Sequence, residues 1–291
     1  MTRRELLALA SERLGSREEA VWLLEGASGK NLAELVLSLG EEAPSEEADL
    51  VSRMLQRRQS GEPLQYVLGT WGFRGLDLKV DARALIPRPE TEVLVDIALA
   101  ELGRFAAATA EPRCRVADLG TGSGAIALAI ASEAAELLDE VWATDSSGSA
   151  LELARMNSSR LADVEPHAAA KLRLARGSWY EALPRRLVGE LGVIASNPPY
   201  VAASEMARLP VEVVEWEPAA ALLAGPAGIE AIREVLLGAP RWLAPGGSVV
   251  VEIGAGQAGA AVEISHEAGF CCSSVRRDLA GLPRVLVACL K

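Results

Sequence analysis

The sequence has few of the residues that bind metals or cross-link chains. Only four of its 291 residues are cysteine and two are histidine, and their spacing matches no metal motif. Cys271 and Cys272 are adjacent, so they would point to opposite faces of a strand, and we expect small buried thiols in a reducing compartment. The sequence therefore predicts neither a metal site nor a disulfide framework.

Basic residues are also in short supply. There are 29 Lys and Arg against 40 Asp and Glu, which gives a net charge of −11. Proteins that bind nucleic acid usually present a basic face, because neutralising phosphates drives much of their affinity. The acidic balance disfavours direct nucleic-acid binding and favours a protein substrate.

Long apolar runs are missing as well. No stretch approaches the ~18 residues that a membrane-spanning helix needs. Residues 1–5 lack the apolar segment of a signal peptide. We therefore expect a cytoplasmic protein with no membrane contact. Its hydrophobic content of 50% is still enough for one large domain or two unequal ones.

The first part of the chain has the pattern of a small helical bundle. Apolar residues recur at helical spacing, as at Leu50, Val51, Met54 and Leu55, and glycine-containing breaks divide the stretch into three to five helices. We expect an N-terminal helical domain over residues 1–62. The pattern then changes to short strands, which predicts a linking β-hairpin within residues 63–84.

Strands and helices alternate in the remainder, residues 85–291. The clearest helices are 124–134, 228–242 and 257–268. The expected strands are 115–119, 140–145, 171–176, 191–196, 247–254, 271–277 and 284–290. Such alternation predicts an α/β fold with a mainly parallel seven-stranded sheet and helices on both faces. The last two strands look like a hairpin, so one strand should be antiparallel.

Asn197-Pro198-Pro199-Tyr200 is the most informative stretch, because it follows the apolar strand 191–196. Two consecutive prolines forbid a helix and stop the strand, so the chain must leave the sheet as a stiff segment. The carboxyl edge of an open α/β sheet is where ligands bind. One amide, two carbonyls and one aromatic ring held there suit a planar amide or amino group. The competing interpretation is a strand ending in a turn, with Tyr200 as ordinary packing.

A glycine-rich turn, Gly120-Thr121-Gly122-Ser123-Gly124, links the strand 115–119 to an apolar helix. Glycines permit a tight turn and a close ligand, and the helix start offers free N–H groups. The same residues fit a dinucleotide-binding pattern, so the turn alone is a weak signal. Asp118 just before it would repel a pyrophosphate but suits the cationic end of S-adenosylmethionine.

Asp145 ends the second expected strand, 140–145. A carboxylate at this place is positioned to accept hydrogen bonds from both ribose hydroxyls of a nucleoside cofactor. The alternative is that Asp145 caps the following helix, 149–160. In this position the ligand role is the stronger hypothesis.

With these motifs the sequence resembles the class I (Rossmann-like) methyltransferases and, among them, the PrmC/HemK family of protein-(glutamine-N5) methyltransferases, which modify peptide-chain release factors. The resemblance runs from about Gly61 to the C-terminus. The glycine turn is common to the superfamily, whereas the segment 86–92 (Ile-Pro-Arg-Pro-Glu-Thr-Glu) is much more specific. The family pattern also covers residues 61–66, 85–95, 197–200, 216–218 and 278–287.

The resemblance implies transfer of a methyl group from S-adenosylmethionine to a glutamine amide in the GGQ motif of class-1 release factors. Asn197 and the Pro198 carbonyl would accept the two amide hydrogens, with Pro199 and Tyr200 completing the substrate site. Asn197, Pro198 and Tyr200 are thus the catalytic candidates. We expect a monomer whose helical domain docks the substrate. The implied cofactor-binding residues are Gly120, Thr121, Gly122, Ser123, Gly124, Asp145, Ser178, Trp179 and Asn197.

One position departs from the family pattern. Related enzymes often carry Asp where this chain has Ser178, accepting a bond from the adenine amino group. Serine can accept the same bond, but more weakly because it is uncharged. Trp179 next to it is expected to pack on the adenine, with core packing as a close competitor.

Three other functions compete with this interpretation. A ribosomal-protein glutamine methyltransferase would share the site, but the segments 86–92 and 278–287 favour release factors. An adenine-N6 or guanine-N2 nucleic-acid methyltransferase uses the same tetrapeptide on a flipped base, yet no basic groove is visible. A non-catalytic dinucleotide-binding or redox module would leave residues 197–200 without a purpose.

Overall fold

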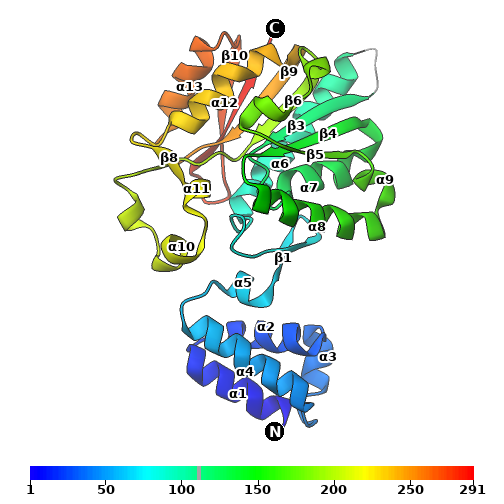
Figure 1. Ribbon diagram of the computed structural model, residues 1–291, viewed down its shortest axis with the longest axis vertical. Helices are drawn as coiled ribbons and strands as arrows, with labels where there is room; N and C mark the ends of the chain where they lie inside the picture. Colours follow the sequence, from blue (N-terminus) through cyan, green and yellow to red (C-terminus); the bar gives the residue numbers. More distant parts are fainter. Residues whose placement is uncertain (110–112) are drawn as a thin grey trace. The chain divides into compact units, whose positions relative to one another are not determined.

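The computed structural model of the protein describes residues 1–109 and 113–291 (Figure 1). The chain divides into two compact units. Unit 1 comprises Met1–Trp71 and Pro210–Trp216, and unit 2 comprises Gly72–Leu209 and Glu217–Lys291. A short segment late in the sequence thus belongs with the N-terminal residues: Arg58 in unit 1 forms an ion pair of 2.8 Å with Glu212.

Unit 1 is helical, as the apolar spacing predicts. Its helices are α1 (Arg3–Leu14), α2 (Arg17–Ser28), α3 (Leu32–Leu37), α4 (Ser45–Gln59), α5 (Leu64–Leu68) and α10 (Val211–Trp216). Thr2 and Glu5 form a capping box that starts α1. Gly15 and Gly29 end α1 and α2 in the left-handed conformation, so the glycine-containing breaks are helix ends.

The hairpin prediction is wrong at its start, because residues 64–68 form α5. Pro63 precedes this helix, and Leu64 and Val67 are one turn apart and pack in a cluster with Leu23 and Met54. The need to bury that pair outweighs the strand-like composition. The hairpin begins only after Gly69, as strands β1 (Thr70–Phe73) and β2 (Leu76–Lys79).

Unit 2 is built on a seven-stranded sheet, counting strands within the described residues. Its order is β10-β11-β9-β6-β3-β4-β5. β11 runs antiparallel to both neighbours, and the other adjacent pairs are parallel. The seven predicted strands and the single antiparallel one are therefore confirmed. The strands are β3 (Cys114–Leu119), β4 (Leu138–Asp145), β5 (Leu172–Arg176), β6 (Leu191–Ser196), β9 (Leu243–Glu252), β10 (Cys272–Arg277) and β11 (Pro283–Cys289).

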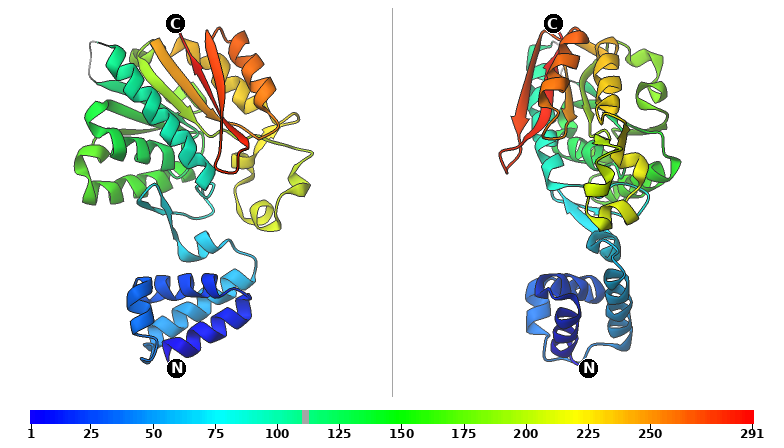
Figure 2. Two further views of the ribbon diagram at one scale, coloured as in Figure 1. Left: turned by 180° about the vertical axis from the view of Figure 1, so that it is seen from behind. Right: turned by 90° about the vertical axis from the view of Figure 1, so that its left-hand side faces the viewer.

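Helices cover both faces of this sheet (Figures 1 and 2). One layer contains α6 (Pro89–Ala108), α7 (Ala125–Ala134), α8 (Gly148–Val164) and α9 (Pro166–Ala169). The other contains α12 (Glu230–Gly238) and α13 (Ala258–Glu267). Successive strand residues alternate between the two cores, as Val116 and Ala117 do on β3.

Residues between β6 and α12 add small elements that the sequence pattern did not predict. β7 (Val201–Ala202) pairs in parallel with β8 (Leu223–Gly225), and α11 (Ala219–Leu222) precedes β8. These elements are too short to leave a periodic signal. They bring Pro218, Ala220 and Ala221 back toward the carboxyl ends of the strands.

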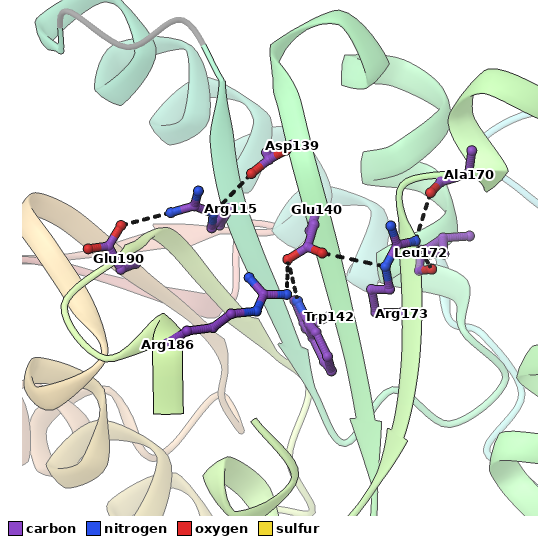
Figure 3. Close-up of polar contacts among 9 residues, drawn as sticks. All are labelled: Arg115, Asp139, Glu140, Trp142, Ala170, Leu172, Arg173, Arg186 and Glu190. Carbon is purple, nitrogen blue, oxygen red and sulfur yellow. Dashed lines mark hydrogen bonds and ion pairs between the residues drawn. The ribbon is translucent and has the colours of Figure 1, made fainter. Parts of the chain in front are cut away.

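A charged network lies along the amino-terminal half of the central strands (Figure 3). Glu140 on β4 accepts hydrogen bonds from Arg186 at 2.7 Å and from the Trp142 indole at 3.1 Å. Arg115 on β3 bridges Asp139 and Glu190. These pairs are partly exposed, so each adds little stability. They lie near the first residues of the strands, away from the carboxyl edge of the sheet.

The thiols are less buried than predicted. Cys114 is buried, whereas Cys271 and Cys272 are exposed, because β10 is the edge strand of the sheet. All four cysteines are free. No helix among residues 1–109 and 113–291 has the length and apolar character needed to cross a membrane.

Candidate active site

The candidate site is a cavity of about 240 Å³ in unit 2, at the carboxyl ends of β3, β4 and β6. Parallel strands end at a common edge, so the segments that follow them meet there. The predicted site residues that line it are Gly120, Thr121, Gly122, Ser123, Asp145, Ser178, Trp179, Asn197 and Pro199. The three predicted residues that do not line it are Gly124, Pro198 and Tyr200.

The glycine turn is held against the end of β4. The N–H groups of Gly120 and Thr121 both donate to the Thr144 carbonyl at 2.9 Å. Gly120 and Gly122 have φ values of 74° and 56°, which a side chain would strain. Gly124 also has a positive φ, 87°, and a Cβ there would lie 3.3 Å from the Ala154 Cβ of α8, so this glycine also permits the close approach of α8.

Asp118 lies behind the turn rather than on the cavity wall. It is fully buried, and its Oδ2 accepts from the Thr121 hydroxyl at 2.5 Å and the Ala127 N–H at 3.2 Å. Its Oδ1 has no hydrogen-bond partner in the structure. Burial raises the pKa of this carboxyl to about 7, against the lowering effect of those two bonds. The carboxyl group thus supports the turn and the start of α7 from inside.

Asp145 does not cap α8, because the N-cap is Ser147, whose side chain accepts from the Ala150 N–H. The Asp145 Oδ2 accepts from the Gly122 N–H at 2.9 Å, and its Oδ1 accepts from the Ser147 N–H at 2.8 Å, just before α8. The side chain also lines the cavity. A carboxylate oxygen has two acceptor sites, so each oxygen keeps one for a ligand hydroxyl.

Ser178 and Trp179 follow β5 and close another side of the cavity. Trp179 has a φ of 46°, a left-handed conformation that costs energy for a bulky residue. Its carbonyl accepts from the Thr144 hydroxyl at 3.2 Å, which helps to hold this backbone. Its ring lies near Gly120, where a Cβ would be 3.5 Å from the ring edge. Ser178 is exposed.

The Asn-Pro-Pro-Tyr segment leaves β6 as the prolines require. Asn197 and Pro199 line the cavity, and Pro198 is buried. The Tyr200 carbonyl accepts from the Gln257 side chain at 2.9 Å, and its hydroxyl lies 3.5 Å from Glu252 Oε1. Burial, with the nearby Glu252 charge, raises the pKa of the Tyr200 hydroxyl to about 12, so it stays protonated.

Several polar residues of the site were missed by the sequence analysis. Thr91, within the segment 86–92, lines the cavity and donates to Glu252 at 2.7 Å. Glu252 is 1% exposed and ends β9 beside β6. Glu217 is buried and pairs with Arg88 on the cavity wall. Glu252 could have been found from the sequence, because it is an acid at the end of the apolar run of β9. Nothing in the nearby sequence indicated that Thr91 would be its partner.

Comparison with known proteins shows which family the chain resembles. Residues 5–69 match the PrmC N-terminal domain, and residues 102–217 match the methyltransferase small domain. The release factor glutamine methyltransferase of Gloeobacter violaceus is 36% identical over 96% of this chain and 93% of its own length. That of Xylella fastidiosa is 39% identical over 97% and 96%.

A solved structure, the release factor-specific protein-(glutamine-N5) methyltransferase of Alicyclobacillus acidocaldarius, is 27% identical. It covers 74% of this chain and 99% of its own, with a TM-score of 0.40, and the assignment does not depend on it. The two sequence relatives are more than one-third identical to this chain over almost its whole length. This chain belongs to the family of release factor glutamine methyltransferases.

Proposed function

We propose that this protein transfers a methyl group from S-adenosylmethionine to the side-chain amide nitrogen (N5) of the glutamine in the GGQ motif of class-1 release factors. One observation carries the proposal: Asn197 lines the same cavity as Asp145 and the glycine turn. A group suited to a planar amide thus stands next to groups suited to a nucleoside cofactor.

The residues present fit S-adenosylmethionine. Asp145 keeps one acceptor on each oxygen for the ribose hydroxyls, and the turn at Gly120–Ser123 offers backbone without side-chain bulk. Trp179 and Ser178 would contact the adenine. The cofactor, when bound, supplies a methyl group activated by its positively charged sulfur.

What the protein itself must do is present the substrate nitrogen. An amide nitrogen is a poor nucleophile, because its lone pair is delocalised into the carbonyl. The Asn197 oxygen and the Pro198 carbonyl would accept its two hydrogens and fix its position, while the Tyr200 ring covers the amide plane. Catalysis on this account is positioning and electrostatics, and no strong general base is needed before the new bond forms.

The partner is a class-1 release factor, and the protein acts in the cytoplasm as a monomer. We assign residues 1–62 to substrate docking, 63–84 to a linker and 85–291 to methyl transfer. The similarity of residues 5–69 to the PrmC N-terminal domain supports a specialised role for the first of these. The net charge of −11 argues against nucleic acid as substrate.

One experiment tests the proposal. The protein is incubated with labelled S-adenosylmethionine and, separately, a release factor, ribosomal proteins or nucleic acid, and the label is mapped by mass spectrometry. We expect label on the GGQ glutamine of the release factor. Label on a ribosomal-protein glutamine, or on adenine or guanine, would replace this substrate by one of the alternatives.

A further inference from the structure

A chain of three polar side chains runs behind the cavity, from Asn197 to Glu252. The Asn197 Nδ2 donates to the Thr91 Oγ1 at 3.2 Å, and the Thr91 Oγ1 donates to the Glu252 Oε2 at 2.7 Å. Thr91 is 4% exposed and Glu252 1%. Three separate elements supply these groups: the first turn of α6, the segment after β6 and the end of β9.

The direction of each hydrogen bond in this series of three side chains follows from counting protons. A hydroxyl carries one hydrogen, and an ionised carboxylate can only accept. Thr91 must therefore give its hydrogen to Glu252, so toward Asn197 it can only accept. The Asn197 atom that faces Thr91 must then be the NH2 group, which leaves the amide oxygen for the cavity.

We propose that Thr91 and Glu252 are positioning residues that fix the orientation of the Asn197 amide, so that its oxygen and not its NH2 meets the substrate nitrogen. The inference rests on the proposed function, because it assigns the orientation needed to accept a hydrogen from a glutamine amide. An amide rotated by 180° would place a donor against the substrate NH2 and lose that bond.

The elements that carry Thr91 and Glu252 fix the positions of both residues relative to Asn197. β6 and β9 are neighbouring parallel strands, with Ser196 opposite Val251, so Asn197 and Glu252 follow at the same level. Thr91 is held beside both by α6, which begins at Pro89. A buried hydrogen-bonded carboxylate is costly to keep, and orienting another group is a reason to retain it.

The arrangement also makes the orientation dependent on pH. Burial raises the pKa of Glu252 to about 7, although Thr91 and Arg284 of β11 oppose the shift; Glu90 of α6 and Tyr200 also face this group. Below that pH the protonated acid can donate to Thr91, and Thr91 can then donate to Asn197. Both amide orientations become possible, so the wild-type advantage should fade in acid.

The test compares Thr91→Val and Glu252→Gln with the wild-type protein on an intact release factor, at saturating S-adenosylmethionine and pH 8. Each variant removes the fixed order of donors with little change in shape. We expect kcat to fall roughly three- to tenfold, as for loss of one hydrogen bond, and Thr91→Ser to recover most of the loss. Thr70→Val and Glu234→Gln, the same changes at exposed positions, serve as controls.

Two readouts separate orientation from general damage. In an Asn197→Ala background, Thr91→Val should cause no further loss, because there is no amide left to orient. The ratio of wild-type to Glu252→Gln activity should approach one as the pH falls below about 7. The ratio is needed because the pKa of Asp118 is also raised to about 7 and affects both proteins alike.

Equal kcat for wild type, Thr91→Val and Glu252→Gln would overturn the inference, as would an undiminished effect of Thr91→Val in the Asn197→Ala background. If Glu252→Gln is unstable by its thermal midpoint, Thr91→Val and its effect in the Asn197→Ala background still decide. If Thr91→Val is unstable, Glu252→Gln and the pH ratio still decide. A wild-type protein that does not methylate the release factor would instead overturn the proposed function, so the two failures are distinguishable.

Discussion

The Arg88 guanidinium forms an ion pair with the buried carboxylate of Glu217 on the wall of the candidate cofactor cavity. The other Glu217 oxygen accepts from the Ile86 N–H at 3.2 Å. Glu217 therefore holds two residues of the loop 85–88, which lines the cavity. Its side chain is 1% exposed and that of Arg88 32%, so the acid is the buried anchor of the pair.

Removing this anchor should destabilise the fold and the cavity together. Glu217→Ala leaves the Ile86 N–H without its acceptor, so we expect the free energy of unfolding to fall by ~1–3 kcal/mol. Binding of S-adenosylmethionine should weaken too, because Ile86 and Arg88 line the cavity. Urea denaturation and calorimetry measure the two effects. Glu215→Ala, an exposed neighbour, is the control, and equal results for both variants would count against an anchoring role.

Asp145 should account for a large share of cofactor affinity. Hydrogen bonds to a charged group contribute ~1.5–3 kcal/mol, so Asp145→Ala should weaken S-adenosylmethionine binding by roughly ten- to a hundredfold. The same change releases the Gly122 N–H, which adds to the loss. Calorimetry on this variant and on Asp163→Ala, an exposed control, measures the effect. Unchanged affinity would remove Asp145 from the site, and tighter binding of NADH than of S-adenosylmethionine would reject the cofactor.

Asn197→Ala should mainly slow the chemical step. The change removes an acceptor that matters most as positive charge develops on the substrate nitrogen, so we expect kcat to fall by ~10²–10³-fold. Cofactor affinity should fall much less. Rapid-quench measurements with labelled S-adenosylmethionine and a release factor give the rate. A near wild-type rate would reduce the tetrapeptide to a strand terminator.

Tyr200 should act through its ring rather than its hydroxyl. The hydroxyl lies 3.5 Å from Glu252, at the limit of a hydrogen bond, and a pKa of about 12 keeps it protonated. Tyr200→Phe should thus change kcat/KM by about threefold or less, the effect of a weak hydrogen bond. Tyr200→Ala should raise KM and lower kcat. The ring role would be contradicted if Phe proved as damaging as Ala in the same assay.

Glu252 should make the fold less stable as the pH rises. Burial raises its pKa from 4.5 to about 7, so the folded protein binds this proton more tightly than the unfolded chain. The free energy of unfolding therefore falls between pH 4.5 and about 7. Glu252→Gln removes this fall. Relative to that of the wild type, the free energy of unfolding of the variant should therefore rise by roughly 2 kcal/mol between about pH 5 and about pH 8.

Urea denaturation at several pH values measures this shift. Asp118 has a pKa that burial raises in the same direction, but it is present in both proteins and cancels in the difference. If the difference in unfolding free energy between variant and wild type does not vary with pH, burial does not raise the pKa of Glu252.

The helices of residues 1–60 should serve the protein substrate and not the chemistry. A protein that begins at Gly61 should keep its affinity for S-adenosylmethionine and its slow rate on a short glutamine peptide. On the intact release factor kcat/KM should fall by about tenfold or more, since docking contacts of ~1.4 kcal/mol suffice for that. Circular dichroism checks the fold, because the shortened chain loses the Arg58–Glu212 ion pair. Equal kcat/KM for both proteins on the release factor would make these helices merely structural.

The α/β architecture and the places of the candidate ligand groups follow from local sequence patterns. Buried parallel strands are continuous apolar runs, such as residues 191–196, and prolines or glycines end them by local stereochemistry. Because parallel strands end at one edge, the turn at Gly120–Gly124, Asp145 and Asn197 could be placed together before any contact was known. The helix at 64–68 was misjudged because its short pattern is decided by the cluster in which it is buried.

Which polar groups meet is a property of the folded chain and not of its local patterns. Thr91 lies 106 residues from Asn197 and 161 from Glu252 in the chain, and Arg88 lies 129 from Glu217, so no local spacing records these bonds. Folding also placed Asp118 and Gly124, which were ligand candidates on the sequence, as supports behind the cavity. Apolar periodicity reports which face of a strand is buried; a hydrogen bond depends on where one atom points, and that is settled only when α6, β6 and β9 pack together.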